Sequence, residues 1–274
     1  MKNSSFEIKI FVDSKEMGKA AAKDVAALLR EYTAKRKKRV VINFAAAPSQ
    51  DFFLAQLCRE KGIAWNKVTA VHLDEYVDLK RGHPNTFESY LREHLFSKIN
   101  IPAENVHYIK ALKGSAKQIA AGYGRFIKST VGGVRKSGGI YIACIGIGVN
   151  GHIAFNEPHV NKRTPEWVIP VKIDSVSVRQ QYNDYKNNPN PAARYENLEE
   201  VPRNAVTVSC AGILNADRIF CIVPGKHKAD AVKAMWDGPV TDKLPASLLR
   251  MHPDMTLYLD KGSAGKLDRV PLVK

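Results

Sequence analysis

The sequence has no run of about 18 or more apolar residues, which is the length that a membrane-spanning helix requires. The first residues, Met1–Glu7, also lack the apolar core of a secretory signal peptide. These two absences argue against a membrane protein and against a secreted one. We therefore expect a soluble, cytoplasmic protein that has no membrane partner.

Cysteine is scarce as well, and no two cysteines stand in a CxxC pair. Three of the four lie in apolar runs, where a reduced thiol behaves as a small hydrophobic side chain. The cysteines thus indicate neither a disulfide framework nor a zinc site. They are Cys58, Cys144, Cys210 and Cys221.

Acidic residues are few relative to basic ones: Asp and Glu number 27, Lys and Arg number 42, and the formal net charge is +15. This excess favours anionic partners, either phosphorylated metabolites or nucleic acid. The densest basic cluster, Lys35–Arg39, follows an amphipathic helix, whose solvated C-terminus favours cations. Because no RNP-like aromatic pattern, zinc finger or helix-turn-helix signature accompanies the cluster, nucleic acid is the less favoured partner.

Strand-like and helix-like segments alternate along almost the whole chain. The strand-like segments are 6–12, 40–44, 68–73, 106–109, 140–145, 205–209, 219–223 and 255–259. Helical patterns begin at Asp13 and near Ser49, where the helix stops at Gly62; others cover 86–99, 116–130 and 228–236, with a short one around Leu248.

Repeated βα units predict a doubly wound α/β fold, in which a mainly parallel sheet carries helices on both faces in a Rossmann-like, three-layer arrangement. At 274 residues and 45% hydrophobic residues the chain can bury a full core, so we expect a single domain over 1–274. The segment 158–203 breaks the alternation and is predicted to be less regular.

The most informative segment is Gly146–Pro158, a glycine-rich bend that follows the apolar run 140–145. An apolar run without alternation is typical of a parallel strand that is covered on both faces. The bend carries one His, one Glu and two Asn, and glycine lets the backbone approach a ligand closely. Because loops at strand ends are where function concentrates, we interpret this segment as a site.

Two other strand ends carry candidate site residues. Asp74 and Glu75 stand together where the strand 68–73 ends, and their side chains must diverge if the chain stays extended. One of them can then face a ligand while the other anchors the loop, although a helix cap or a turn acid is an equally good interpretation. Lys226 and Lys228 stand where a strand meets a helix N-terminus, a natural site for an anion such as phosphate.

Five motifs carry a resemblance over most of the chain: Leu73–Val77, His83–Pro84, Ile101–Asn105, Gly148–Pro158, and Pro224–Gly225 with Lys228. With these motifs the chain resembles the glucosamine-6-phosphate deaminase/isomerase family, a branch of the sugar-phosphate group that also includes the 6-phosphogluconolactonases. Tyr76 favours the deaminase branch, because the lactonase motif usually has Arg in that place.

The resemblance implies a reaction and a set of catalytic residues. Family members convert glucosamine 6-phosphate and water to fructose 6-phosphate and ammonia, with neither a metal nor an organic cofactor. The resemblance implies that His152 moves a proton at the ring oxygen during ring opening and that Glu157 orients it. Asp74 is then the base that takes the proton from C2 and returns it at C1, and Asn150 contributes hydrogen bonds rather than charge.

The resemblance also implies a phosphate site. Lys228 matches the family's phosphate-binding lysine, and Gly151 falls among the substrate-binding residues of the motif. The usual Gly-rich phosphate loop is replaced here by Ala45–Ala47 and Pro48. Ala does not readily take the positive φ that is open to Gly, but Ser49 can still offer its hydroxyl and the following amides to a phosphate.

The family's phosphate-binding arginine has no direct counterpart. Arg179 is the nearest candidate and needs a small register shift, without which Gln181 falls in its place. The proton-transfer residues are thus better preserved than the phosphate site. Three alternatives therefore stay open: a 6-phosphogluconolactonase-like hydrolase, an isomerase of another sugar, and a non-catalytic sugar-phosphate sensor. Relatives form assemblies of varied size, so a homo-oligomer also stays open.

Overall fold

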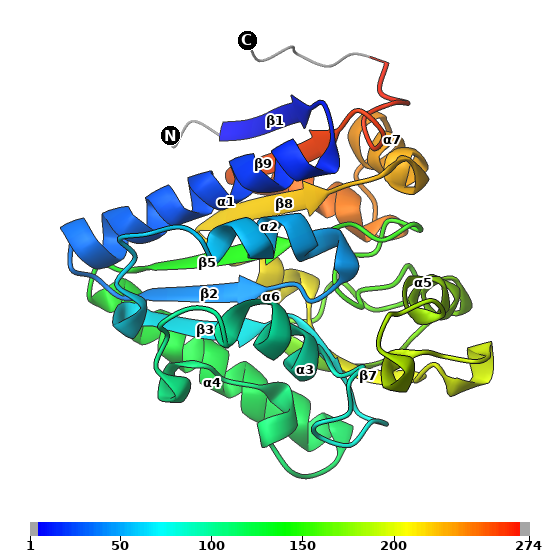
Figure 1. Ribbon diagram of the computed structural model, residues 1–274, viewed down its shortest axis with the longest axis horizontal. Coiled ribbons are helices and arrows are strands. Elements are labelled where there is room, and N and C mark those ends of the chain that lie inside the picture. The colour runs from blue at the N-terminus through cyan, green and yellow to red at the C-terminus, as the bar shows by residue number, and fades with distance from the viewer. Residues whose placement is uncertain (1–4, 269–274) are drawn as a thin grey trace.

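A parallel sheet of six strands runs through the centre of the molecule (Figure 1). The computed structural model describes residues 5–268, so the first four residues of Met1–Glu7 lie outside the described part. The strand order is β1-β9-β8-β5-β2-β3, and each neighbouring pair is parallel. The strands are β1 (Ser5–Phe11), β2 (Val40–Phe44), β3 (Val68–His72), β5 (Ile140–Ile145), β8 (Arg218–Val223) and β9 (Asp254–Asp260).

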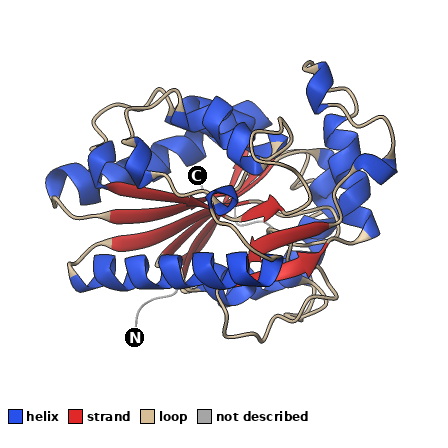
Figure 2. Ribbon diagram, turned by 90° about the horizontal axis from the view of Figure 1, so that it is seen from below, coloured by secondary structure: helices blue, strands red, loops and turns tan. Residues whose placement is uncertain are grey.

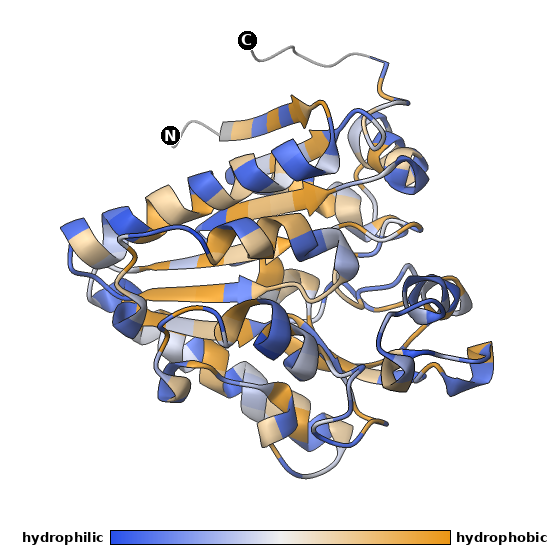
Figure 3. Ribbon diagram, viewed as in Figure 1, coloured by the Kyte–Doolittle hydropathy of each residue, from blue (hydrophilic) through white to orange (hydrophobic). Residues whose placement is uncertain are grey.

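Helices cover both faces of this sheet, as the sequence predicts. The side chains of β5 alternate between two hydrophobic cores: Ile142 packs with residues of α1 and α2, and Tyr141 packs with residues of α4, α6 and α7. Because both faces are buried, the central strands are almost wholly hydrophobic (Figure 3). The helices are α1 (Ser14–Arg30), α2 (Asp51–Leu57), α3 (Phe87–Leu91), α4 (Ala116–Lys136), α5 (Ser175–Tyr185), α6 (Cys210–Leu214) and α7 (Ala229–Asp237).

A second, three-stranded antiparallel sheet lies beside the first (Figure 2). Its order is β4 (Asp74–Tyr76), β7 (Asn204–Val208) and β6 (Val168–Lys172). The predicted strand at 205–209 exists but belongs to this sheet, because the amide of Val208 donates to the carbonyl of Leu73 at 2.6 Å and brings β7 against the chain that leaves β3. The order of elements along a sequence does not encode such a non-local pairing.

The segment 158–203 is less regular than the rest of the chain, as predicted, but it contains β6 and α5, which the sequence analysis does not predict. Helix α5 escapes a search for apolar periodicity because two of its four buried residues, Ser177 and Gln181, are polar. Its start is nonetheless well defined: the carboxylate of Asp174 accepts the amide of Ser177 at 2.9 Å and caps the helix.

The predicted strand at 106–109 is also wrong. Only one bridge forms there, between Val106 and Ala70. The amide of Ile109 donates to Nε2 of the buried His72 at 2.9 Å, so a side chain takes the place of a ladder partner. The chain then turns into a short 3₁₀ helix at Ile109–Ala111.

Three predicted helices differ in extent or type. The helix after Ser49 is a 3₁₀ turn, Pro48–Gln50, followed by α2, and it ends before Gly62. The helix predicted over 86–99 is α3 followed by a π-helical turn at Arg92–Phe96. The segment around Leu248 is the 3₁₀ helix Pro245–Met251.

The basic cluster and the cysteines lie as the sequence predicts. Residues 35–39 are exposed beyond the end of α1, and Lys35 and Arg36 pair with Glu31 at 3.3 and 2.9 Å. Three of the four free cysteines, at positions 144, 210 and 221, are buried. Within residues 5–268, no helix has both the length and the apolar character needed to cross a lipid bilayer.

Candidate active site

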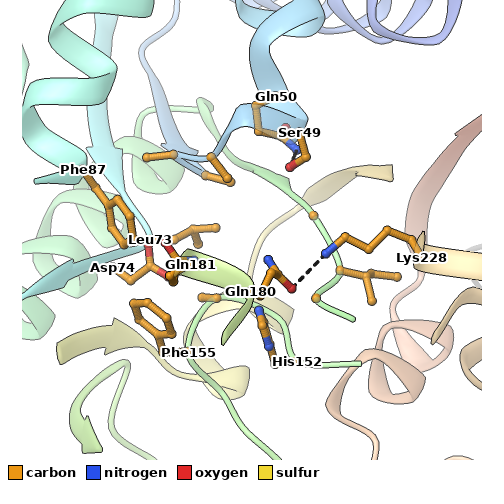
Figure 4. A pocket seen from close by; sticks show the side chains of 17 residues that line it. Ser49, Gln50, Leu73, Asp74, Phe87, His152, Phe155, Gln180, Gln181 and Lys228 are labelled. Carbon is orange, nitrogen blue, oxygen red and sulfur yellow. Dashed lines mark hydrogen bonds between the residues drawn. The ribbon is translucent and has the colours of Figure 1, made fainter. Parts of the chain in front are cut away.

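A pocket opens at the carboxyl ends of the central strands, where ligands bind in open α/β sheets (Figure 4). It lies over the adjacent strands β2 and β5. The next strand of this sheet after β2 is β3, on one side, and the next after β5 is β8, on the other side, so the winding direction reverses between them. Its empty volume, with the open solvent at its mouth included, is about 520 Å³. The lining residues are Ala45–Ala47, Ser49, Gln50, Leu73, Asp74, Phe87, Gly146–Gly148, His152, Ala154, Phe155, Gln180, Gln181 and Lys228.

Asp74 and Glu75 diverge, as the extended chain requires. Asp74 lines the pocket and is 8% exposed. Burial, with the neighbouring charge of Glu75, raises the pKa of Asp74 well above its ordinary value of 3.8. Glu75 points away and accepts the amides of Phe87 and Glu88 at 3.2 and 2.9 Å, so it anchors the start of α3. Asp74 is therefore the carboxylate that a ligand meets.

His152 is held through one ring nitrogen. Its Nδ1 lies 2.7 Å from Oδ1 of Asn150, 2.8 Å from Oγ of Ser177 and 3.5 Å from a carboxylate oxygen of Glu157. The other nitrogen, Nε2, is left for a ligand in the pocket. The sequence thus predicts the partners Asn150 and Glu157 but not Ser177.

The tautomer of His152 follows from the orientation of Asn150. The Asn150 amide nitrogen donates to Glu157 at 2.9 Å and to Asp174 at 3.2 Å, both carboxylates, so its oxygen must face the imidazole. An amide oxygen only accepts, and Nδ1 therefore carries the proton. Burial raises the pKa of Glu157, but hydrogen bonding and charge from His152 outweigh it and keep that pKa below its ordinary 4.5. The carboxylate is thus ionised beside the ring.

Two glycines of the motif make room for neighbouring side chains. A Cβ on Gly148 would lie 2.1 to 2.4 Å from three atoms of the His152 ring. Gly151 has φ +80°, and a Cβ there would lie 2.2 Å from the side chain of Leu244. Gly148 lines the pocket, whereas Gly151 shapes the turn behind it, so a direct substrate contact of Gly151 stays a prediction.

Lys228 brings a cation to the pocket. Its side chain is buried, and its ammonium donates to Oε1 of Gln180 at 3.1 Å (Figure 4). Burial lowers the pKa of Lys228 to about 8, against the opposing effect of Asp184, so the side chain is mostly protonated at neutral pH. A second hollow, lined by Ser49, Lys228, His227 and other residues, adjoins the pocket.

The alanine loop keeps ordinary backbone geometry. Among the described non-glycine residues, positive φ occurs only at Lys37 and Ala154, so Ala45–Ala47 does not need the left-handed conformations of glycine. The hydroxyl of Tyr90 donates to the carbonyl of Ala47 at 2.7 Å and holds the loop from α3. Ser49 lies at the mouth of the pocket, between the loop and Lys228.

Arg179 does not reach this pocket. It is exposed and lines a neighbouring hollow with Asp184 and His227 at the outer rim, whereas Gln181 lines the pocket itself. Its role as a phosphate ligand stays a prediction. Sequence reasoning missed Ser177 and Gln180 because α5 was not predicted; their spacing of three residues on one helix face was the available signal.

The pocket brings ionisable side chains of three kinds together. Within residues 5–268, no cluster of three or more His, Cys, Asp and Glu side chains is placed to hold a metal ion. The pocket combines a buried carboxyl, an imidazole with one free nitrogen, and an ammonium. These groups can move protons on a ligand whose anionic group the ammonium holds.

Known proteins share this arrangement of elements. The family model described as glucosamine-6-phosphate isomerases/6-phosphogluconolactonase matches residues 12–182. A glucosamine-6-phosphate deaminase of Thermoanaerobacter pseudethanolicus is 30% identical over 261 residues, which cover 94% of each chain. One of Clostridium perfringens is 32% identical over 254 residues, which cover 91% of this chain and 94% of the relative.

Solved structures agree in fold. A monomeric glucosamine-6-phosphate deaminase superimposes with a TM-score of 0.82 at 24% identity, over 94% of this chain and 99% of that chain. A 6-phosphogluconolactonase from Thermotoga maritima gives a TM-score of 0.71 at 16% identity, over 94% of this chain and 100% of that chain. The chain belongs to the glucosamine-6-phosphate isomerase/6-phosphogluconolactonase family and is an enzyme of that family.

Proposed function

We propose that this enzyme converts glucosamine 6-phosphate and water to fructose 6-phosphate and ammonia. The observation that carries the proposal is the meeting of Asp74, His152 and Lys228 around one pocket (Figure 4). The similar deaminases, which cover more than nine-tenths of the chain, support the choice of substrate.

Ring opening is the first step. His152 carries its proton on Nδ1, so Nε2 can take the proton from the C1 hydroxyl of the bound pyranose and deliver it to the ring oxygen. The C1–O5 bond breaks and the open-chain aldehyde forms. Glu157 and Asn150 stabilise the imidazolium that exists between the two transfers.

Isomerisation and deamination follow at C1 and C2. The Asp74 carboxylate removes the proton from C2 and yields an enolamine, then returns a proton to C1 to give the imine of fructose 6-phosphate. Water adds to that imine, the C–N bond breaks, and ammonia leaves. A single carboxylate serves both carbons because they are adjacent, and its burial keeps the abstracted proton from exchanging freely with solvent.

Substrate binding depends on the phosphate group of the substrate. Lys228 and Ser49 lie where they can hold the 6-phosphate, and the loop Ala45–Ala47 offers its backbone beside them. A buried ammonium and a hydroxyl are suitable phosphate donors. The net charge of +15 attracts such an anion at long range.

A substrate panel tests the assignment. Purified protein is mixed with glucosamine 6-phosphate, its N-acetyl form, unphosphorylated glucosamine and 6-phosphogluconolactone, and ammonia, hexulose phosphate and acid are assayed. We expect ammonia and fructose 6-phosphate in equal amounts from glucosamine 6-phosphate alone. Acid release from the lactone without any ammonia would instead assign a lactonase, and binding without turnover would assign a sensor.

A further inference from the structure

Gln180 lies between Lys228, at the anion-binding end of the pocket, and residues 146–158, the loop that carries His152 and is called the catalytic loop below. Its Oε1 accepts the ammonium of Lys228 and the backbone amide of Val149, each at 3.1 Å. Val149 stands next to Gly148, against which the His152 ring packs. One amide oxygen therefore fixes both the cation and the loop.

Helix α5, which carries Gln180, contacts the site along one of its faces. One turn earlier on α5, Ser177 contacts Nδ1 of His152, and at the helix start Asp174 accepts from Asn150. One turn later, Asp184 interacts electrostatically with the Gln180 side chain and with Lys228, and it lowers the net positive charge around Lys228. The acceptor oxygen of Gln180 is thus oriented from several sides.

The side chain of Gln180 accepts hydrogen bonds without carrying a negative charge. A carboxylate in place of the amide would keep an acceptor for Val149 but would compete with a phosphate for Lys228. An apolar side chain would leave Lys228 free of that competition but would deprive the Val149 amide of its acceptor. Charge and hydrogen bonding can therefore be separated at this one position.

Building on the proposed function, we propose that Gln180 is a positioning residue with two separable roles. Its acceptor oxygen holds the catalytic loop in the geometry that His152 needs, and its lack of charge leaves Lys228 free to bind the anionic group of the substrate. The first role governs the chemical step. The second governs affinity for a phosphate.

Two variants test the two roles by opposite effects on kcat and KM. Gln180→Glu should keep kcat within about threefold and raise KM about tenfold or more, because a partly buried carboxylate now pairs with Lys228. Gln180→Leu should lower kcat about 10- to 100-fold with a small change in KM, because a slightly misplaced catalytic group is costly. Asn183→Ala, exposed on the same helix, is the control and should match the native enzyme.

Two readouts do not depend on turnover of glucosamine 6-phosphate. Calorimetric titration with inorganic phosphate should show binding about tenfold weaker in Gln180→Glu than in the native protein. Phosphate should shift the NMR signal of the Val149 amide in the native protein and not in Gln180→Leu. Parallel losses of kcat and affinity in both variants, or phosphate binding unchanged in Gln180→Glu, would overturn the proposal even if the substrate assignment holds.

Discussion

Asp74 and Glu75 are adjacent carboxylates with different surroundings. Glu75 receives backbone amides and anchors α3, whereas the carboxyl of Asp74 has no hydrogen bond from another described residue and faces the pocket. Sequence reasoning predicts that the two diverge, because alternation along an extended chain is local. Which of them faces the ligand depends on where the amides of α3 lie, and that is a tertiary property.

Replacing Asp74 should remove activity and stabilise the fold. Burial raises its pKa, so its ionised form destabilises the folded state at neutral pH. Asp74→Asn should lower kcat about 1,000-fold or more and raise Tm by about a few degrees at pH 7.5.

The sign of that effect follows from linkage. The penalty is absent below the unfolded pKa near 3.8, grows as the pH rises from there to the folded pKa, and stays constant above it. The Tm gain should therefore shrink as the pH is lowered toward about 4.5. Melting curves at several pH values measure it. A variant less stable than the native protein at neutral pH would contradict the assignment of a buried, unpaired carboxyl.

Gly148 should be intolerant of even one methyl group. A Cβ there would overlap the imidazole of His152, so Gly148→Ala should displace the ring and lower kcat about 100-fold. Gly132→Ala on α4 is the matched control, because a Cβ there has nothing within 4 Å, and it should keep full activity with equal or higher stability. Steady-state kinetics of the two proteins decides the point.

Among the secondary-structure elements, helix α5 is one that the sequence pattern does not predict. The central strands and most of the helices that cover them were predicted, because their apolar runs and periodicity are strong local signals. Helix α5 and strand β6 were not, since α5 uses Ser177, Gln180 and Gln181 to face the site rather than an apolar stripe. The motif in the sequence identifies the catalytic loop. Its partners on α5 cannot be identified in the same way, because the helix that carries them is not predicted.

The cap of α5 should matter for catalysis more than an ordinary cap does. Asp174 caps the helix and also receives the amide of Asn150, whereas Asp13 caps α1 on the surface. Ala at either position should cost about 1 kcal/mol of folding stability. Only Asp174→Ala should also lower kcat, by about tenfold or more. Asn150 then loses one of the two carboxylate acceptors that hold its amide in the orientation His152 needs.

Thermal melts and kinetics of this pair separate the two effects. Equal activity in both variants would mean that the Asn150–Asp174 contact does not act on His152. A comparable fall in kcat for Asp13→Ala would trace the loss to general stability instead.

At the scale of the whole molecule, two sheets of different type enclose one site. The parallel sheet supplies the loops with Ser49, His152 and Lys228, and the antiparallel sheet begins with Asp74. Alternating βα segments predicted the first sheet, but strand direction in the second arises from pairings between distant parts of the chain. That one domain spans residues 1–274 stays a prediction.

The most direct test of the account follows the hydrogen at C2. Glucosamine 6-phosphate that carries deuterium at C2 is incubated with the enzyme, and the products are analysed by NMR and by an ammonia assay. We predict equimolar ammonia and fructose 6-phosphate, with part of the deuterium at C1, because a buried Asp74 carries it between the two carbons. Folded protein that releases neither product, or releases them without any deuterium at C1, would contradict the account.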